Sequence, residues 1–134
     1  MRLLTQIALV ALGSALGGLT RWGVTVGFAR VCGTSFPWGT LVINLSGSLF
    51  LGWVTTIFRE RLLETGLSWL HPDDLRLMLA VGFTGAYTTF STFEYEAQEL
   101  LRDEDSWQGL IYIFASVLLG LLAVRLGVVL ARWR

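Results

Sequence analysis

The sequence has few of the residues that build disulfide scaffolds, metal centres and charged surfaces. It contains one cysteine (Cys32), one histidine and two prolines, and all ten of its basic residues are arginine. A lone cysteine excludes an intramolecular disulfide, and no Cys/His cluster has the spacing of a zinc site. Ten acids balance the ten arginines. The charge balance therefore predicts no nucleic-acid or other polyanionic partner.

Charge is also absent from four long stretches. No Asp, Glu, Lys or Arg occurs in residues 3–20, 31–58, 77–93 and 106–124. Charged residues make up 15% of the 134-residue chain and hydrophobic residues 54%, and the mean hydropathy is +0.62. A helix needs about 20 apolar residues to cross a bilayer. We expect an all-α, multi-pass membrane protein that forms a single domain over residues 1–134, with spans at about 3–28, 38–58, 74–101 and 106–131.

The first residues, MRLLTQIALVALGSALGG, have the order of a signal peptide. We expect them to remain as the first span, because the other three would bury too little without it. Trp69 and His71 are expected at headgroup level between the second and third spans. Seven of the ten arginines lie at the two ends of the chain and in this connection, which favours a cytoplasmic location for both termini.

Small residues recur four positions apart, a spacing that lets membrane helices approach closely. Four short helices bury little surface on their own, so we expect a dimer. The spaced pairs are Gly13/Gly17, Gly23/Gly27 and Ser48/Gly52.

The third span is unusually polar for this chain. Its stretch TGAYTTFSTFEYE, residues 84–96, contains seven hydroxyl-bearing residues, two phenylalanines and two acids. Glycine and β-branched residues weaken a helix, and a break would free backbone carbonyls at membrane depth. Such carbonyls are tolerated only when they are buried in protein, line a water cavity or bind an ion. The alternative is a continuous helix whose hydroxyls bond back to its own carbonyls.

Two other spans carry polar lines as well. Thr40, Asn44 and Ser48 are four apart in the second span, and Tyr112 and Ser116 are four apart in the fourth. Taken by itself, an asparagine such as Asn44 more commonly forms a hydrogen bond between helices. Hydroxyl and amide donors, together with the electropositive edges of phenylalanine rings, suit a small and strongly hydrated anion. Conduction also requires weak binding, so we expect no arginine in such a path.

These segments resemble the Fluc/CrcB family of fluoride channels. The resemblance rests on GGLTRWG, WGTLVINLSGSLFLG and GFTGAYTTFSTFEYE in the first three spans and on the Tyr112/Ser116 pair in the fourth. It implies a four-helix subunit whose third helix is broken at its centre, paired antiparallel with a second copy. It also implies two pores per dimer in the inner membrane of a bacterium. Fluoride would leave the cytoplasm passively, which lowers its intracellular concentration and toxicity.

The resemblance also assigns individual residues. Backbone carbonyls of Gly85 and Thr88 would hold a structural Na⁺ on the two-fold axis, and Arg21 would draw anions into a vestibule. The partners would be membrane lipid, fluoride and a second subunit. The ion pathway would comprise Asn44, Thr89, Phe90, Ser91, Thr92, Phe93, Glu96, Tyr112 and Ser116.

Three positions depart from the family's usual pattern. Ala86, Tyr87 and Glu94 stand where the family usually has glycine, leucine and a small residue. Glu94 adds an acid near an anion path, which is unfavourable unless it faces away or is neutral. Arg125 lies near or within the fourth span. The uneven distribution of the arginines leaves two alternatives open. One is a homodimer, and the other is an obligate heterodimer with an oppositely oriented paralogue.

Three other classes fit parts of the sequence. A small drug exporter needs an acid in its first span, and residues 3–20 contain none. A membrane enzyme such as a lipid kinase needs a nucleotide site, which nothing here resembles. A purely structural subunit accounts for the small-residue packing but not for polar lines in three spans. We therefore expect a channel and not an enzyme.

Overall fold

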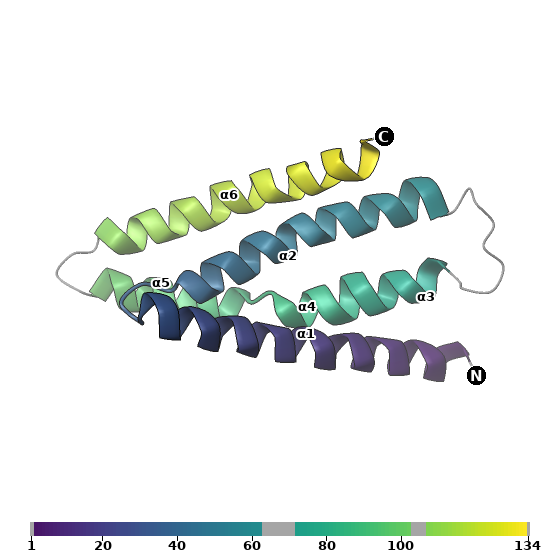
Figure 1. The fold of residues 1–134 in the computed structure, drawn as a ribbon, viewed down its shortest axis with the longest axis horizontal. Coiled ribbons are helices and arrows are strands. Elements are labelled where there is room, and N and C mark those ends of the chain that lie inside the picture. The colour runs from purple at the N-terminus through teal and green to yellow at the C-terminus, as the bar shows by residue number, and fades with distance from the viewer. Residues whose placement is uncertain (1, 63–71, 103–106, 134) are drawn as a thin grey trace.

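The computed structural model describes residues 2–62, 72–102 and 107–133, which form helices joined by short connections. The elongated molecule has α1 along one long edge and α6 along the other, with α2 and the line of α3, α4 and α5 between them (Figure 1). Both ends of the chain lie at the same end of the molecule. The helices are α1 (Arg2–Cys32), α2 (Trp38–Ile57), α3 (Pro72–Arg76), α4 (Gly85–Tyr87), α5 (Phe90–Arg102) and α6 (Trp107–Arg132), with π-helical segments at Phe58–Leu62 and Leu77–Thr84.

Every regular element among the described residues is a helix, which is consistent with a membrane protein. Three of its described helices are long and apolar enough to cross a membrane: Arg2–Cys32, Trp38–Glu60 and Trp107–Arg132. The expected span 74–101 corresponds to the line of α3, the Leu77–Thr84 segment, α4 and α5, and no single helix covers it. The predicted headgroup residues Trp69 and His71 lie outside the described residues.

Glycines on α1 allow it to pack directly against the Leu77–Thr84 segment. A Cβ atom added at Gly13 would overlap the carbonyl oxygen of Met78, and one at Gly17 would overlap that of Phe83. Gly82 faces α1 in the same way, since its Cβ would lie 2.7 Å from the carbonyl oxygen of Val10. Side chains at these positions would separate the two helices. The spacing of Gly13 and Gly17 therefore does indicate a close contact between the two backbones.

The contact between α2 and α6 also depends on glycine. A Cβ at Gly52 would overlap the carbonyl oxygen of Val124, and a Cβ at Gly127 would overlap that of Leu49. The predicted pair Gly23/Gly27 is different, because an added Cβ at either position meets no described atom within 4 Å. That pair lies on an open face of α1.

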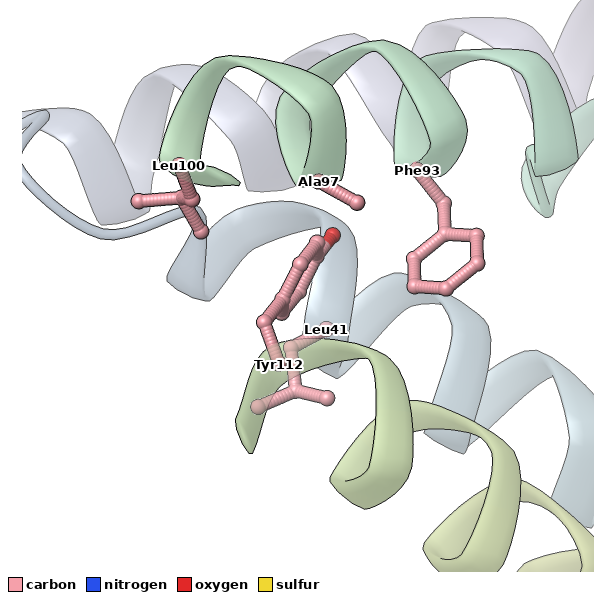
Figure 2. Close-up of a cluster of buried hydrophobic side chains, with 5 residues drawn as sticks. All are labelled: Leu41, Phe93, Ala97, Leu100 and Tyr112. Atoms are coloured by element: carbon pink, nitrogen blue, oxygen red, sulfur yellow. The ribbon is translucent and has the colours of Figure 1, made fainter. Parts of the chain in front are cut away.

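A small core joins α5 to α2 and α6 (Figure 2). It consists of Leu41, Phe93, Ala97, Leu100 and Tyr112, and the Tyr112 side chain is 0% exposed. The Phe93 ring centroid lies 5.2 Å from that of Tyr112. Burying aromatic side chains in this way contributes strongly to packing. The cluster therefore fixes the position of the polar stretch on α5 relative to the other two helices.

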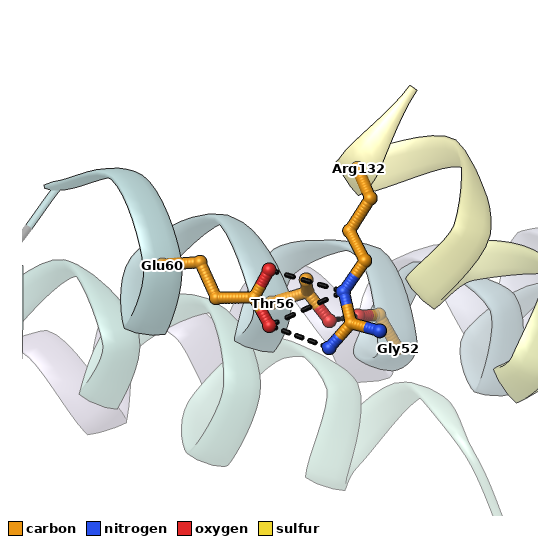
Figure 3. Close-up of polar contacts among 4 residues, drawn as sticks. All are labelled: Gly52, Thr56, Glu60 and Arg132. Atoms are coloured by element: carbon orange, nitrogen blue, oxygen red, sulfur yellow. Dashed lines mark hydrogen bonds and ion pairs between the residues drawn. The ribbon is translucent and has the colours of Figure 1, made fainter. Parts of the chain in front are cut away.

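An ion pair joins the C-terminal end of α6 to the end of the second span (Figure 3). Arg132 donates from Nη2 to Glu60 Oε1 at 2.6 Å and from Nε to Oε2 at 3.0 Å. Thr56 lies one turn earlier and donates to the Gly52 carbonyl at 2.7 Å. The pair is bidentate, but both side chains are exposed.

Replacing Glu60 with glutamine should leave the unfolding temperature in detergent almost unchanged. An exposed ion pair contributes little, because solvent screens it and ordering two long side chains costs entropy. A large fall in the unfolding temperature of Glu60→Gln would show that the pair is shielded from solvent in the assembled protein.

Candidate functional site

The polar stretch is interrupted between α4 and α5. Gly85–Tyr87 is helical, Thr88 is extended with φ −77° and ψ 157°, and α5 begins at Phe90. Within the stretch from Gly85 to Thr88, only Thr88 leaves the helical conformation. Its N–H and its hydroxyl both donate to the carbonyl of Thr84, at 3.0 and 2.9 Å.

Asn44 on α2 binds the backbone at this interruption. Its Nδ2 donates to the carbonyl oxygen of Thr89 at 3.0 Å, and its Oδ1 accepts from the N–H of Thr89 at 2.9 Å. The amide thus satisfies a donor and an acceptor of the same residue, as a neighbouring strand would. The polar line on α2 therefore faces the interruption, and one N–H of the Asn44 amide is not used in this pairing.

The side chain of Thr89 caps the helix that follows. Its hydroxyl accepts from the N–H of Thr92 at 3.3 Å and donates to the Thr92 hydroxyl at 2.9 Å. An N-cap residue typically accepts from the N–H three positions later, which is the geometry observed. Two backbone N–H groups, that of Thr89 before α5 and that of Thr92 in its first turn, are therefore directed at side chains instead of at carbonyls four residues earlier.

A pocket of about 270 Å³ opens beside the interruption, between α2, α5 and α6. Asn44, Thr89, Phe90, Phe93 and Ser116 all line it. The ring centroids of Phe90 and Phe93 are 5.9 Å apart. The hydroxyl of Ser116 is buried and has no hydrogen-bond partner among the described residues. The pocket thus combines an unused buried donor with aromatic rings.

A second polar group lies further along α5. The two carboxylate oxygens of Glu96 accept separate hydrogen bonds, one from Thr40 at 2.8 Å and one from Tyr112 at 2.9 Å. Glu96 and Thr40 also line a pocket of about 370 Å³ near the connection between α1 and α2. Donors from α2 and α6 therefore converge on one position of α5, where they bind a negative charge.

Among the other residues singled out in the sequence, Thr92 contacts the interruption through its hydrogen bonds with Thr89. Ser91, Thr92 and Glu94 are exposed on α5, as is Arg125 on α6, and Arg21 is half-buried on α1. None of these five lines either pocket.

The contacts of Tyr87 were not predicted from the sequence. It is buried, its ring stacks on Phe83 at a centroid distance of 5.6 Å, and its hydroxyl lies 2.9 Å from that of Ser46 on α2. Gly47 provides the space for this approach, because a Cβ there would overlap the Thr88 side chain. A tyrosine among hydroxyl residues signals a buried hydrogen bond, but the sequence does not identify its partner.

The π-helical turn Leu77–Thr84 was also not predicted. The Thr84 hydroxyl donates to the carbonyl of Leu79, five residues earlier, at 2.8 Å. Gly82, within this segment, also approaches the backbone of α1. The pattern of apolar residues carries no signal that separates this turn from an α-helix.

Backbone oxygens are the groups at this site that fit a metal ion. Among residues 2–62, 72–102 and 107–133, no three His, Cys, Asp or Glu side chains are grouped as metal ligands. A continuous helix would pair the carbonyl of Gly85 with the N–H of Thr89, and that of Thr88 with the N–H of Thr92. Both N–H groups are bound elsewhere. Neutral oxygens of this kind suit a hard cation.

Residues 8–128 match the model of the family described as CrcB-like protein, Camphor Resistance (CrcB). A Synechococcus sp. (strain JA-2-3B'a(2-13)) protein named fluoride-specific ion channel FluC is 44% identical, over 93% of this chain and 92% of its own. A protein of the same name from Hahella chejuensis is 43% identical, over 95% of this chain and 94% of its own. A third, from Chloroflexus aurantiacus (strain ATCC 29366 / DSM 635 / J-10-fl), is 39% identical over 97% and 98% of the two chains.

Proposed function

The chain belongs to the CrcB family, and on that premise we propose that it is a fluoride-selective channel through which fluoride leaves the cytoplasm passively. The family and the names of its relatives indicate an ion channel and not an enzyme. The channel would act in the inner membrane of a bacterium. Passive release would limit the fluoride that accumulates in the cytoplasm.

The observation that carries this proposal is the pocket between α2, α5 and α6. Its buried Ser116 hydroxyl has no partner among the described residues, and the rings of Phe90 and Phe93 stand beside it. A buried donor without a partner is costly unless something accepts its hydrogen bond. A fluoride ion is a small acceptor that would do so, while the electropositive edges of the rings would replace part of its hydration shell.

The remaining pathway residues would act as donors at successive positions. Tyr112 and Thr40 donate to the Glu96 carboxylate, so they are already oriented toward a negative group. Fluoride would compete with that carboxylate for the same hydroxyls. Ser91 and Thr92 are exposed in the single chain, where a second subunit would complete their surroundings. Binding by hydroxyls without a full positive charge would keep the ion free to leave.

We include the pairing and the cation in the proposal. Two copies would associate antiparallel, with two pores per dimer, and the carbonyls of Gly85 and Thr88 from both chains would hold a structural Na⁺. Gly85 is exposed, and an added Cβ there meets no described atom within 4 Å, so its face is open to a partner. Bound Na⁺ would balance the partial charge of the freed oxygens. Arg21 would contribute positive potential at the vestibule.

Fluoride release from liposomes that contain only this purified protein tests the proposal. We expect rapid release, read with a fluoride electrode, and no release of chloride under the same gradient. This result would also establish that one kind of subunit is sufficient. Release of both anions at similar rates would contradict fluoride selectivity.

If correctly inserted protein releases no fluoride, the next test is whether it needs a paralogous, oppositely oriented subunit. Co-reconstitution with such a subunit would then restore release if the channel is a heterodimer. If no combination conducts fluoride, the proposed function is wrong.

A further inference from the structure

Asn44 and Thr89 both line the pocket, and both also bind backbone N–H groups at the interruption. The second property gives them a role in deciding which backbone oxygens stay free. We propose that they are positioning residues for the cation site: they hold two N–H groups that would otherwise bond to the carbonyls of Gly85 and Thr88. The inference rests on the structural Na⁺ of the proposed function.

The first diverted donor is the N–H of Thr89. In an uninterrupted helix it would bond to the carbonyl four residues earlier, which belongs to Gly85. Here it donates to Asn44 Oδ1 at 2.9 Å, and the carbonyl of Thr89 accepts from Asn44 Nδ2 at 3.0 Å. Because the Asn44 amide binds both the N–H and the carbonyl of Thr89, it satisfies these groups and also restrains their direction. Asn44 therefore keeps the Gly85 oxygen available.

The second diverted donor is the N–H of Thr92. An uninterrupted helix would direct it to the carbonyl of Thr88. Here it points to the Thr89 hydroxyl at 3.3 Å. The hydroxyl is itself held because it donates to the Thr92 hydroxyl at 2.9 Å. The cap of α5 thus leaves the Thr88 oxygen available, and the same residue, Thr89, takes part in both diversions.

The helix α2 also provides the space in which the interruption fits. Gly47 lies against the Thr88 side chain, where a Cβ would overlap, and Ser46 hydrogen-bonds Tyr87 at 2.9 Å. All these contacts lie within one chain. The free carbonyls are therefore prepared before a partner or an ion arrives, which lowers the cost of ordering the site. The contact between Ser46 and Tyr87 joins α2 to α4 beside the same interruption but diverts no backbone donor, so it provides a control.

Sodium binding is the measurement that separates this role from a role in conduction. The purified protein in detergent, prepared without sodium, is equilibrated with radioactive Na⁺ by dialysis. We expect Thr89→Val and Asn44→Ala to weaken Na⁺ binding by roughly ten- to hundredfold, the usual effect of removing a group that orients metal ligands. Thr89→Ser keeps the hydroxyl and should restore wild-type binding. Tyr87→Phe removes only the hydrogen bond to Ser46 and should bind Na⁺ as the wild type does.

Several outcomes with these variants would contradict the inference. Wild-type Na⁺ binding in Thr89→Val would overturn it even if Asn44→Ala fails to fold. Equal weakening in Tyr87→Phe, or failure of Thr89→Ser to restore binding, would show that general loosening of the helices is responsible. If the wild type conducts fluoride but binds no Na⁺, the inference is wrong and the proposed channel still stands. If the wild type binds Na⁺ but conducts no fluoride, the proposed channel is wrong, and the Na⁺ binding of the variants still decides the inference.

Discussion

Replacing Phe90 with isoleucine should reduce fluoride release from liposomes to the level of protein-free liposomes, while the proposed dimer remains assembled. Phe90 is 70% exposed in the single chain and lines the pocket that also contains the Ser116 hydroxyl. An exposed side chain contributes little to the folding of its own subunit, so the protein should still fold. Isoleucine is apolar and large but lacks the electropositive ring edge that would face the anion.

Phe114→Ile is the matched control. Phe114 is 71% exposed on α6 and lines a separate, apolar pocket. The same change at nearly the same exposure should leave fluoride release unchanged. Size-exclusion chromatography of both variants checks that the dimer persists. Undiminished release from an assembled Phe90→Ile dimer would remove this ring from the pathway.

Replacing Gly127 with alanine should destabilise the folded protein by about 1–3 kcal/mol, the usual cost of overpacking a tight contact. The new methyl group would overlap the carbonyl oxygen of Leu49 and lie 2.8 Å from the backbone nitrogen of Trp53. Both atoms belong to the backbone of α2, so no rotation of a side chain can relieve the contact. The helices α2 and α6 would have to separate. Thermal unfolding in detergent measures the loss.

Gly120→Ala provides the comparison on the same helix. The nearest atom to a Cβ at this position is the Ser48 hydroxyl oxygen at 4.0 Å, which is ordinary contact. Alanine also favours a helix over glycine. We expect the unfolding temperature to stay the same or rise slightly. An equal fall in both variants would mean that loss of glycine itself, and not the approach of α2, causes the change.

The sequence was sufficient to predict the helical membrane class and the direction of the polar line on α2. Charge-free stretches of span length and polar residues four apart are local patterns, and Thr40, Asn44 and Ser48 do face the polar stretch from one side of their helix. The close approaches at Gly13, Gly17 and Gly52 follow from the same kind of spacing. A helix that packs one face against protein has a periodic pattern of residues in its sequence.

What the sequence could not supply is the pairing of donors with acceptors. Asn44 was predicted as a donor to an ion or as a link between helices. The structure shows the link, but the sequence did not identify its partner, the two backbone groups of Thr89. The spacing of Gly23 and Gly27 resembles that of Gly13 and Gly17, yet among the described residues only the latter pair has atoms within 4 Å of an added Cβ. Partners distant in sequence are chosen by the tertiary arrangement, and periodicity does not encode them.

The order of the helices along the chain has a consequence for how the protein enters the membrane during its synthesis. The expected span 74–101 would be a poor candidate to insert alone, because α5 carries three acids and the backbone before it is interrupted at Thr88. Helix α2, with Asn44 and Gly47, is made earlier and is apolar enough to be in place already. The emerging interruption therefore meets its hydrogen-bonding partner on arrival and is not left exposed to lipid. Moving α2 to a later position in a permuted gene would remove that advantage without changing one contact of the finished fold.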